Sequence, residues 1–329
     1  MDREHVCIIT LTRDEKAKKH YRFFSPAVAT KASREAMSRN ILQIYRQYNL
    51  DGIEIDWEYP GHEGASGNKM DPSDTRNFLL FLCCLRATLP STARITAAVQ
   101  TVPFTDHDGK IIPEFADYLD WILIMNYDVW PCKPLLFTKP CSQTADPPCT
   151  ASPNPGPNAP MHDACRNSTQ PEANMVAAYH AWTNAGFSPS QLVIGVPSYG
   201  YVSPSKATNL RTRANSSTVA VTPNSGQIPF RDLVSQGALN CTTPASSTSP
   251  RSCVASGGYE RCWDDCSSTP FMRSSSAGQV ISYDDPESLE MKGQLARNLK
   301  MLGINMFDVH GDTDQWDLTT SLRKGLGCS

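Results

Sequence analysis

Apolar residues recur along the chain with two alternating periods, which predicts strands separated by helices. The predicted strands cover residues 6–11, 53–58, 95–99, 122–127, 192–196 and 306–309. The predicted helices cover residues 33–48, 74–89, 173–185 and 286–302. Residues 71–74 form a capping segment for the second helix, and Pro90 stops it. Strands and helices in alternation, with strands that are mostly apolar, are typical of an α/β protein with a parallel sheet or barrel.

Two stretches interrupt this rhythm. Residues 131–160 hold nine prolines and three cysteines without any periodicity, which predicts a long loop or an insertion. Residues 201–278 are polar and rich in Ser, Thr and Gly, so we expect an insertion before the last barrel strand. The remaining text has no internal repeat, and we interpret residues 1–329 as one catalytic domain carrying both insertions.

The composition narrows the class of protein. Apolar residues make up 40% and charged residues 19% of the 329 residues, which is ordinary for a folded protein and too apolar for disorder. The net charge of −3 gives no case for nucleic acid or an anionic membrane as a partner. No apolar run approaches the roughly 20 residues that span a bilayer. We therefore expect a globular protein, and a monomer.

The twelve cysteines suggest an oxidising compartment. Cys7, Cys83 and Cys84 resemble small buried apolar residues. The others, except Cys328, fall in two loop-rich stretches, at Cys132, Cys141, Cys149 and Cys165 and at Cys241, Cys253, Cys262 and Cys266. Disulfides are favoured there, with connectivity left open. Zinc is the alternative, but no histidine has ligand-type spacing to these cysteines, so we expect no metal.

Three glycosylation sequons, at Asn167, Asn215 and Asn240, also suit a secreted protein. The first residues contain neither a basic start nor an apolar signal stretch. The expectation is therefore a secreted type of protein whose chain, as given, carries no signal peptide.

The most informative segment is the predicted strand at residues 53–58. Glu54, Asp56 and Glu58 are two apart and share one face of a strand, while the alternate positions are Ile, Ile and Trp. In a barrel the apolar face would pack on the helices and the acidic face would enter the barrel. Pro60 follows, so Glu58 would lie at the C-terminal mouth, where barrel enzymes place their chemistry.

Three neighbouring carboxylates repel one another and are costly to desolvate. Sharing protons relieves this and raises the pKa of at least one of them. A carboxylic acid that stays protonated near neutrality can act as a general acid. A solvated edge strand with unrelated acids is the alternative, and it explains poorly why the opposite face is Ile-Ile-Trp.

Residues 51–61, Asp-Gly-x-x-x-Asp-Trp-Glu-Tyr-Pro-Gly, resemble the signature of family 18 glycoside hydrolases, the chitinase family. Further segments similar to motifs of this family follow in order, at residues 125–128, 195–200, 281–285 and 303–307. The resemblance covers residues 24–326 outside the proline-rich stretch and is nearest to fungal chitinases.

This resemblance implies a TIM-type (β/α)8 barrel and hydrolysis of chitin with help from the substrate's own N-acetyl group. Glu58 would be the general acid, Asp56 and Tyr127 would hold the acetamide, and Glu54 would assist Asp56. No metal or organic cofactor is implied. Further residues in or near the matching segments would bind chitin or chitooligosaccharides: Asp51, Tyr59, Met125, Asn126, Asp128, Trp130, Tyr199, Tyr201 and Phe307. Trp263 is another candidate for stacking on a sugar or for packing the insertion.

The sequence departs from the family in three places. Glu54 stands where the family has an Asp, which moves that carboxylate by about an ångström. Phe307 stands where the family has a Trp below the central sugar. Residues 6–11 would be the third barrel strand, so no residues of this sequence correspond to strands one and two. We therefore expect an incomplete, N-terminally truncated barrel.

Three alternatives to a chitinase stay open from the sequence. The same acetamide chemistry serves an endo-β-N-acetylglucosaminidase that cleaves N-glycan cores. A chitin-binding protein on the same fold is a second, although such proteins usually lose the acid that Glu58 supplies. An inactive product of the truncated chain is the third.

Overall fold

The computed structural model describes residues 8–11, 23–62, 64, 68–129, 156–203, 226–242 and 252–328. The chain divides into two compact units, which are described separately. The first comprises Met1–Met125 and Tyr179–Val193, and the second comprises Asn126–Ala178 and Ile194–Ser329.

Six strands form one sheet whose strand order follows the chain, β1-β2-β3-β4-β5-β13. Their bounds are β1 Ile8–Leu11, β2 Gly52–Asp56, β3 Arg94–Val99, β4 Trp121–Met125, β5 Leu192–Pro197 and β13 Gly303–Phe307. The first four pair in parallel, with Ile9 opposite Ile53 and Ile53 opposite Ile95. Strand β5 begins in the first unit and ends in the second. The alternation of apolar strands and helices in the sequence therefore predicted the parallel sheet correctly.

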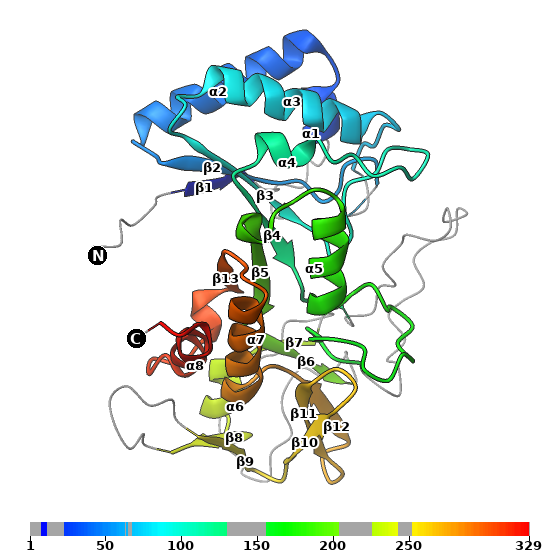
Figure 1. Ribbon diagram of the computed structural model, residues 1–329. Helices are drawn as coiled ribbons and strands as arrows, with labels where there is room; N and C mark the ends of the chain where they lie inside the picture. Colours follow the sequence, from blue (N-terminus) through cyan, green and yellow to red (C-terminus); the bar gives the residue numbers. More distant parts are fainter. Residues whose placement is uncertain are drawn as a thin grey trace. The chain divides into compact units, whose positions relative to one another are not determined.

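In the first unit, helices lie along one side of strands β1–β4 (Figure 1). They are α1 Phe24–Val28, α2 Lys31–Gln47, α3 Asp74–Thr88, α4 Phe115–Tyr118 and most of α5 Met175–Asn184. Helix α2 begins with a capping box in which Thr30 and Ser33 bond to each other's backbone N–H groups. Helix α3 buries Phe78, Phe81 and Leu85, whereas Cys83 faces solvent. Cys83 was thus wrongly interpreted as buried, because it lies on the exposed side of the helix.

Aromatic rings connect strand β2 to these helices within the first unit. Trp57 stacks on Phe24, with ring centroids 5.3 Å apart, and meets Phe78 edge-on at 5.4 Å. Phe78 contacts Phe104 at 5.7 Å, and Phe104 contacts Trp182 at 5.3 Å. Pairs at such distances add about 0.5–1.5 kcal/mol each to the area they bury. This aromatic layer is the part of the core that holds the apolar face of β2.

Asp120, directly before β4, joins three elements of the first unit. Its carboxylate accepts the backbone N–H of Ile95 at 2.8 Å and contacts Arg86 at 2.7 Å and Arg94 at 3.0 Å. Burial raises the pKa of Asp120, but these donors and charges more than offset it, so that the pKa lies below its ordinary value.

The second unit contains a five-stranded sheet, built in residues 199–282, with the order β10-β11-β12-β6-β7. Its strands are β6 Tyr199–Ser203, β7 Gln227–Pro229, β10 Glu260–Asp264, β11 Thr269–Ser274 and β12 Gln279–Ser282. The pairs are antiparallel. Helix α6 (Phe230–Ser235) and the ribbon of β8 (Leu239–Cys241) and β9 (Cys253–Ala255) complete this part. The described parts of residues 201–278 thus form most of a small sheet of their own.

Among the described residues of the second unit, four cysteines form two disulfides. Cys165–Cys266 joins the two cysteine-rich stretches, and Cys241–Cys253 closes the β8–β9 ribbon. Cys262 is not in a disulfide, and Cys7, Cys132, Cys141 and Cys149 lie outside the described residues. The expectation of disulfides is confirmed for these two pairs.

Helices α7 (Pro286–Asn298) and α8 (Asp317–Leu326) pack against each other in the second unit (Figure 1). They meet at two glycines. A Cβ atom on Gly325 would lie 2.2 Å from the carbonyl oxygen of Glu290, and one on Gly293 would lie 2.8 Å from that of Leu322. No side chain fits there, so these glycines set the close approach of the two helices.

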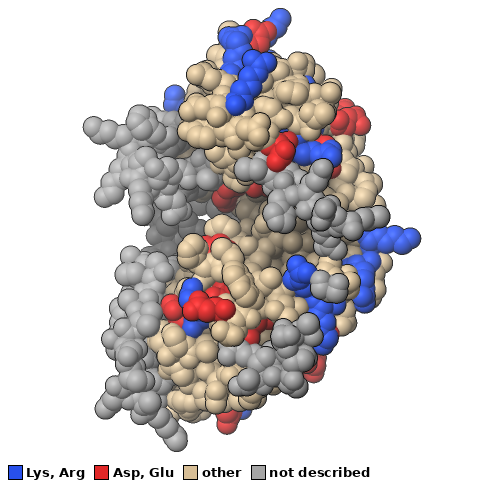
Figure 2. Space-filling model, turned by 90° about the vertical axis from the view of Figure 1, so that its left-hand side faces the viewer, with Lys and Arg blue, Asp and Glu red and all other residues tan. Residues whose placement is uncertain are grey.

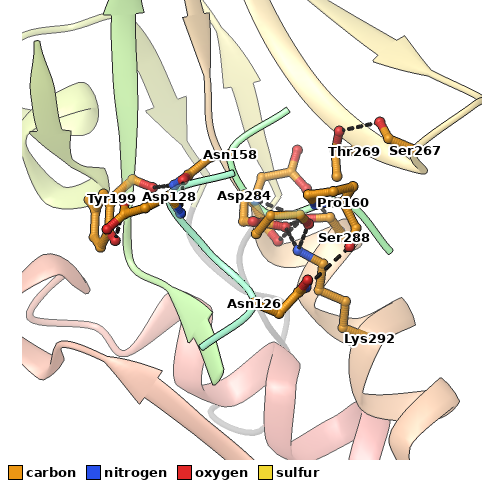
Figure 3. A network of polar contacts seen from close by, with 12 residues as sticks. Asn126, Asp128, Asn158, Pro160, Tyr199, Ser267, Thr269, Asp284, Ser288 and Lys292 are labelled. Atoms are coloured by element: carbon orange, nitrogen blue, oxygen red, sulfur yellow. Dashed lines mark hydrogen bonds and ion pairs between the residues drawn. The ribbon is translucent and has the colours of Figure 1, made fainter. Parts of the chain in front are cut away.

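A buried ion pair anchors the inner side of α7. Lys292 is 0% exposed, and its Nζ lies 2.6 Å from Asp284 Oδ1 and donates to the carbonyl oxygen of Ala159, also at 2.6 Å. Ser288 Oγ donates to the same Asp284 oxygen at 2.7 Å (Figure 3). Burial lowers the pKa of Lys292 and raises that of Asp284, while each charge favours the other.

The predicted elements are present, with shifted ends. Strands β2 and β4 each end two residues earlier than predicted, and the last strand lies at Gly303–Phe307 rather than 306–309. The helix predicted to reach residue 302 ends at Asn298. No helix in the described ranges is both long and apolar enough to cross a membrane. Figure 2 shows that one face carries charges of both signs in small groups.

Candidate active site

Strand β2 presents its acids and its apolar residues on opposite faces, as the alternation predicted. Ile53, Ile55 and Trp57 are buried, whereas the acidic side chains between them are not. Asp56 is half-buried, and Glu58 is exposed two residues beyond the C-terminal end of the strand. Glu58 therefore lies in the following loop, a correction to the predicted strand end, because the ladder with β3 ends at Asp56.

Glu54 is held between the two neighbouring strands. Its carboxylate accepts hydrogen bonds from the hydroxyls of Thr10 on β1, at 2.8 Å, and Thr96 on β3, at 3.4 Å. Burial raises the pKa of Glu54, the charge of Asp56 raises it further, and the two hydroxyls oppose this. The carboxyl groups of Glu54 and Asp56 are thus electrostatically coupled, as expected for neighbouring acids on one strand face.

The second unit gathers four aromatic residues and one acid. Tyr127 and Asp128 follow β4, Tyr199 and Tyr201 are on β6, and Phe307 ends β13. Tyr127 stacks on Phe307 with centroids 5.9 Å apart and meets Tyr199 edge-on at 6.4 Å. Phe307 is 52% exposed, so this aromatic residue is partly accessible from solvent even though its ring stacks on Tyr127.

Asp128 is the polar centre of this group. The hydroxyls of Tyr199 and Tyr201 both donate to Asp128 Oδ1, each at 2.6 Å. Burial and the adjacent Asp128 carboxylate raise the pKa of Tyr199 well above its ordinary value. Tyr199 therefore stays a protonated donor at neutral pH, and the two hydroxyl donors together fix the orientation of the Asp128 carboxylate.

Other expected substrate residues have different positions. Asn126 is fully buried, and its side-chain amide donates to the carbonyl of Pro160 at 3.1 Å; its expected role in substrate binding stays a prediction. Asp51 precedes β2, at the end of the strand opposite Glu58, and its backbone carbonyl accepts the N–H of Arg94; its expected role in substrate binding stays a prediction. Met125 ends β4 and Tyr59 follows Glu58, both half-buried. Trp130 lies outside the described residues.

The ring of Trp263, on β10, is in contact with the side chain of Arg261 from the same strand. The guanidinium carbon of Arg261 lies 5.2 Å from the ring centroid, and Arg261 itself bonds to Asp285 and Glu287. This cation–π contact favours the packing interpretation of Trp263 over a sugar platform.

One residue at this group was missed by the sequence analysis. Asn158 is 1% exposed and bonds to the backbone of both Asp128 and Tyr199. It lies in the proline-rich stretch, which has no periodicity, and a lone Asn before Ala-Pro carries no signal that distinguishes it from a turn residue.

Among the described residues, one cluster has the spacing of a metal site, Cys241, Cys253 and Asp317. Its two cysteines form a disulfide, and so they offer no thiolate ligands.

The chain resembles known proteins over most of its length. The model of the family described as glycosyl hydrolases family 18 matches residues 16–312. The chain belongs to this family. A chitinase-like effector of Moniliophthora roreri is 30% identical, over 93% of this chain and 74% of that protein. Chitinase A1 of Niallia circulans is 26% identical, over 89% of this chain and 39% of that protein.

Solved structures of the family agree with the fold. The crystal structure of a chitinase from Rhizomucor miehei has a TM-score of 0.71 at 26% identity, covering 93% of this chain and 81% of that chain. The Group IV chitinase of Ostrinia furnacalis, in complex with allosamidin, has a TM-score of 0.71 at 19% identity, covering 98% and 79%. The second likeness concerns the fold alone. The six strands in chain order, with their helices, are consistent with a TIM-type α/β barrel.

Proposed function

We propose that this chain hydrolyses β-1,4-linked N-acetylglucosamine polymers by a substrate-assisted mechanism that retains the anomeric configuration. The observation that carries the proposal is the polarised strand β2, with coupled acids on one face and exposed Glu58 just beyond its C-terminal end. Membership of family 18 and similarity to chitinases support the substrate class.

In the first step, Glu58 gives its proton to the glycosidic oxygen and the bond from that oxygen to the anomeric carbon breaks. The carbonyl oxygen of the substrate's N-acetyl group forms a bond to the anomeric carbon on the opposite face, which gives an oxazolinium ion. Asp56 accepts the acetamide N–H and stabilises the positive charge, and the Tyr127 hydroxyl donates to the acetamide carbonyl.

In the second step, the Glu58 carboxylate takes a proton from water, and the water oxygen forms a bond to the anomeric carbon. The bond from this carbon to the acetamide oxygen breaks, which opens the oxazolinium ring and restores the N-acetyl group. Two inversions at this carbon give net retention. Glu54, whose pKa is raised by burial and by the charge of Asp56, shares a proton with Asp56, and Asp128, with Tyr199 and Tyr201, lines the acetamide subsite. Phe307 offers the apolar platform below the sugar.

Proton NMR of the first products from chitotetraose tests the stereochemistry. We expect the β-anomer to appear first and to convert slowly to the α-anomer. Early α-anomer would overturn the retaining mechanism.

The acid role is tested by Glu58→Gln, which keeps the shape and removes the proton. We expect turnover to fall at least roughly 10²-fold with chitotetraose binding largely kept. Glu35→Gln is the matched control, because Glu35 is a partly exposed carboxylate on α2 with an ion pair to Lys31. A full loss in the control, or none in Glu58→Gln, would place the acid elsewhere.

A chitin-binding protein without catalysis is the second candidate. Two observations support this candidate. Two relatives are each named a chitinase-like effector, and Glu54 and Phe307 depart from the residues expected in the family. Retention of the wild-type chain on chitin beads without release of soluble sugars over days would support this candidate and exclude the first.

We also propose that the protein is a secreted, monomeric glycoprotein. Two disulfides support passage through an oxidising compartment, and the sequon residues Asn167 and Asn240 are both exposed. After expression in a secreting eukaryotic host, enzymatic removal of N-glycans should increase the gel mobility of the wild type. The variant with both Asn167→Gln and Asn240→Gln should lose the part of this shift that these two sites cause.

A further inference from the structure

The buried side chain of Asn158 joins the two segments that carry the tyrosine–aspartate group. Its Oδ1 accepts the backbone N–H of Asp128 at 2.9 Å, and its Nδ2 donates to the backbone carbonyl of Tyr199 at 3.0 Å (Figure 3). The N–H of Val129 donates to the Asn158 carbonyl at 3.1 Å. At 1% exposure, water cannot replace these bonds, so acceptor and donor are both needed.

The residue that Asn158 holds has an unusual backbone. Asp128 has a φ of 59°, in the left-handed region that an Asp adopts when local hydrogen bonds favour it. The carboxylate that this backbone presents is exposed and accepts both tyrosine hydroxyls. The direction of the Asp128 carboxylate thus depends on a backbone conformation that Asn158 stabilises by accepting the Asp128 N–H.

The segment around Asn158 is itself fixed on several sides. Lys292 donates to the carbonyl of Ala159, and Asn126 donates to the carbonyl of Pro160 at 3.1 Å. The N–H of Met161 donates to the carbonyl of Ser267 at 2.9 Å. Helix α7, the segment that follows β4 and the β10–β11 turn therefore hold Asn158 in place, so that it can fix the position of the Asp128 backbone.

We propose that Asn158 is a positioning residue for hydrolysis, which orients the Asp128 carboxylate and, through the Tyr199 backbone, the tyrosine that bonds to it. This inference rests on the proposed function. Asn158 touches no substrate. It acts by keeping Asp128 and Tyr199 in register, and a displacement of about 1 Å at such a site can reduce turnover about 10²-fold.

The test is Asn158→Asp, which keeps the size of the side chain and the acceptor for Asp128. The donor becomes a carboxylate oxygen that faces the Tyr199 carbonyl and repels it. We expect kcat on chitotetraose to fall roughly 10- to 100-fold at neutral pH, with a change in KM of less than about threefold.

The pH dependence of the defect distinguishes positioning from simple damage. Below the pKa of the introduced carboxyl, its O–H can donate to the Tyr199 carbonyl again, so the ratio of wild-type to variant kcat should shrink as the pH falls. The groups around this position are the Asp128 carboxylate, the Tyr199 and Tyr201 hydroxyls, and Lys292 beyond Ala159. The negative charge of Asp128 raises the pKa of the introduced carboxyl and brings this recovery to a higher pH.

Asn174→Asp is the matched control. Asn174 is also buried, and it makes the same two kinds of bond, accepting the N–H of Ala177 at 2.9 Å and donating to the carbonyl of Pro171 at 2.8 Å. It lies directly before α5, outside the tyrosine–aspartate group. We expect this variant to keep kcat within about twofold, because its side chain has no bond to Asp128 or Tyr199.

A double-mutant cycle with Asp128→Ala decides whether Asn158 acts through Asp128. In the Asp128→Ala background, Asn158→Asp should reduce kcat by less than about threefold, since the residue it positions is gone. Equal losses in both backgrounds, or an unchanged kcat in the single variant, would overturn the inference. If Asn158→Asp does not fold by thermal melting, Asn158→Ser replaces it in the cycle with the same expectation. An inactive wild type would instead refute the proposed function.

Discussion

The buried pair of Lys292 and Asp284 allows a sharp prediction about stability. Lys292→Met keeps much of the apolar stem and removes the charge and both short hydrogen bonds. The Asp284 carboxylate then keeps the Ser288 hydroxyl as a partner for Oδ1. The Ala159 carbonyl loses the bond from Nζ. Leaving a buried charge without its counter-ion typically reduces the free energy of unfolding by about 3–5 kcal/mol.

The assay is urea unfolding of the wild type and the variant, followed by fluorescence, with thermal melting as a second measurement. At about 2–4 °C per kcal/mol for a cooperative unit of 150–250 residues, the expected decrease in Tm is roughly 6–20 °C. The double variant Lys292→Met with Asp284→Leu removes both charges, so it should recover most of this loss.

Lys324→Met is the matched control for this substitution. Lys324 also bonds to a carboxylate, that of Glu290, at 2.8 Å, but its side chain is 55% exposed. A surface ion pair of this kind contributes about 0–1 kcal/mol. Equal losses in Lys292→Met and Lys324→Met would refute the reasoning that burial makes the difference.

Three further predictions follow from the strand acids, the helix contact and the Asp120 junction. Glu54→Gln should flatten the pH dependence of stability. Because the pKa of Glu54 is raised in the folded state, its contribution to stability is full below the ordinary value of 4.5 and is lost as the pH rises through the folded-state pKa. If the urea midpoint of the variant varies with pH as that of the wild type does, this prediction is wrong. Gly325→Ala should destabilise the protein by roughly 1–3 kcal/mol in urea unfolding, because the new Cβ would meet the carbonyl oxygen of Glu290. Gly303→Ala is its control, since a Cβ at Gly303 has no atom within 4 Å. Similar losses in the two variants would argue against the close contact of the helices. Asp120→Asn should remove stability that is full above the ordinary pKa of 3.8 and that the wild type itself loses as the pH falls through the lowered folded-state pKa of Asp120. A constant difference from wild type across the acidic range in thermal melting would show that charge is not the cause.

The sequence predicted best what depends on local period. The alternation at residues 53–58 correctly assigned the faces of β2, because a strand's period of two leaves one arrangement that buries Ile, Ile and Trp together. Strand ends were less predictable. The apolar or alternating pattern of the sequence continues through Glu58 and Tyr127, yet each strand ends two residues earlier. The length of a strand also depends on its partner strand, which the local pattern does not contain.

Contacts between distant segments could not be predicted from the pattern. The disulfide Cys165–Cys266 joins residues 101 apart, and spacing alone left its pairing open. The bonds of Asp128 to Tyr199 and Tyr201 likewise join separate segments, and nothing local marks them. The hydrogen bond from Asn126 to the carbonyl of Pro160 also joins separate segments, and no local pattern predicts it.

The two faces of β2 experience opposite forces, electrostatic repulsion on the acidic face and close packing on the apolar face. Its acids repel one another and would relax by moving apart, which a free strand could do by bending. The stacked rings of Trp57, Phe24 and Phe78 oppose this motion, because sliding the strand would separate surfaces that are packed against helices α1 and α3. The apolar face, which has no titratable groups, therefore keeps the carboxyl groups of Glu54 and Asp56 close together, and packing on one side of the backbone contributes to the raised pKa of Glu54 on the other side.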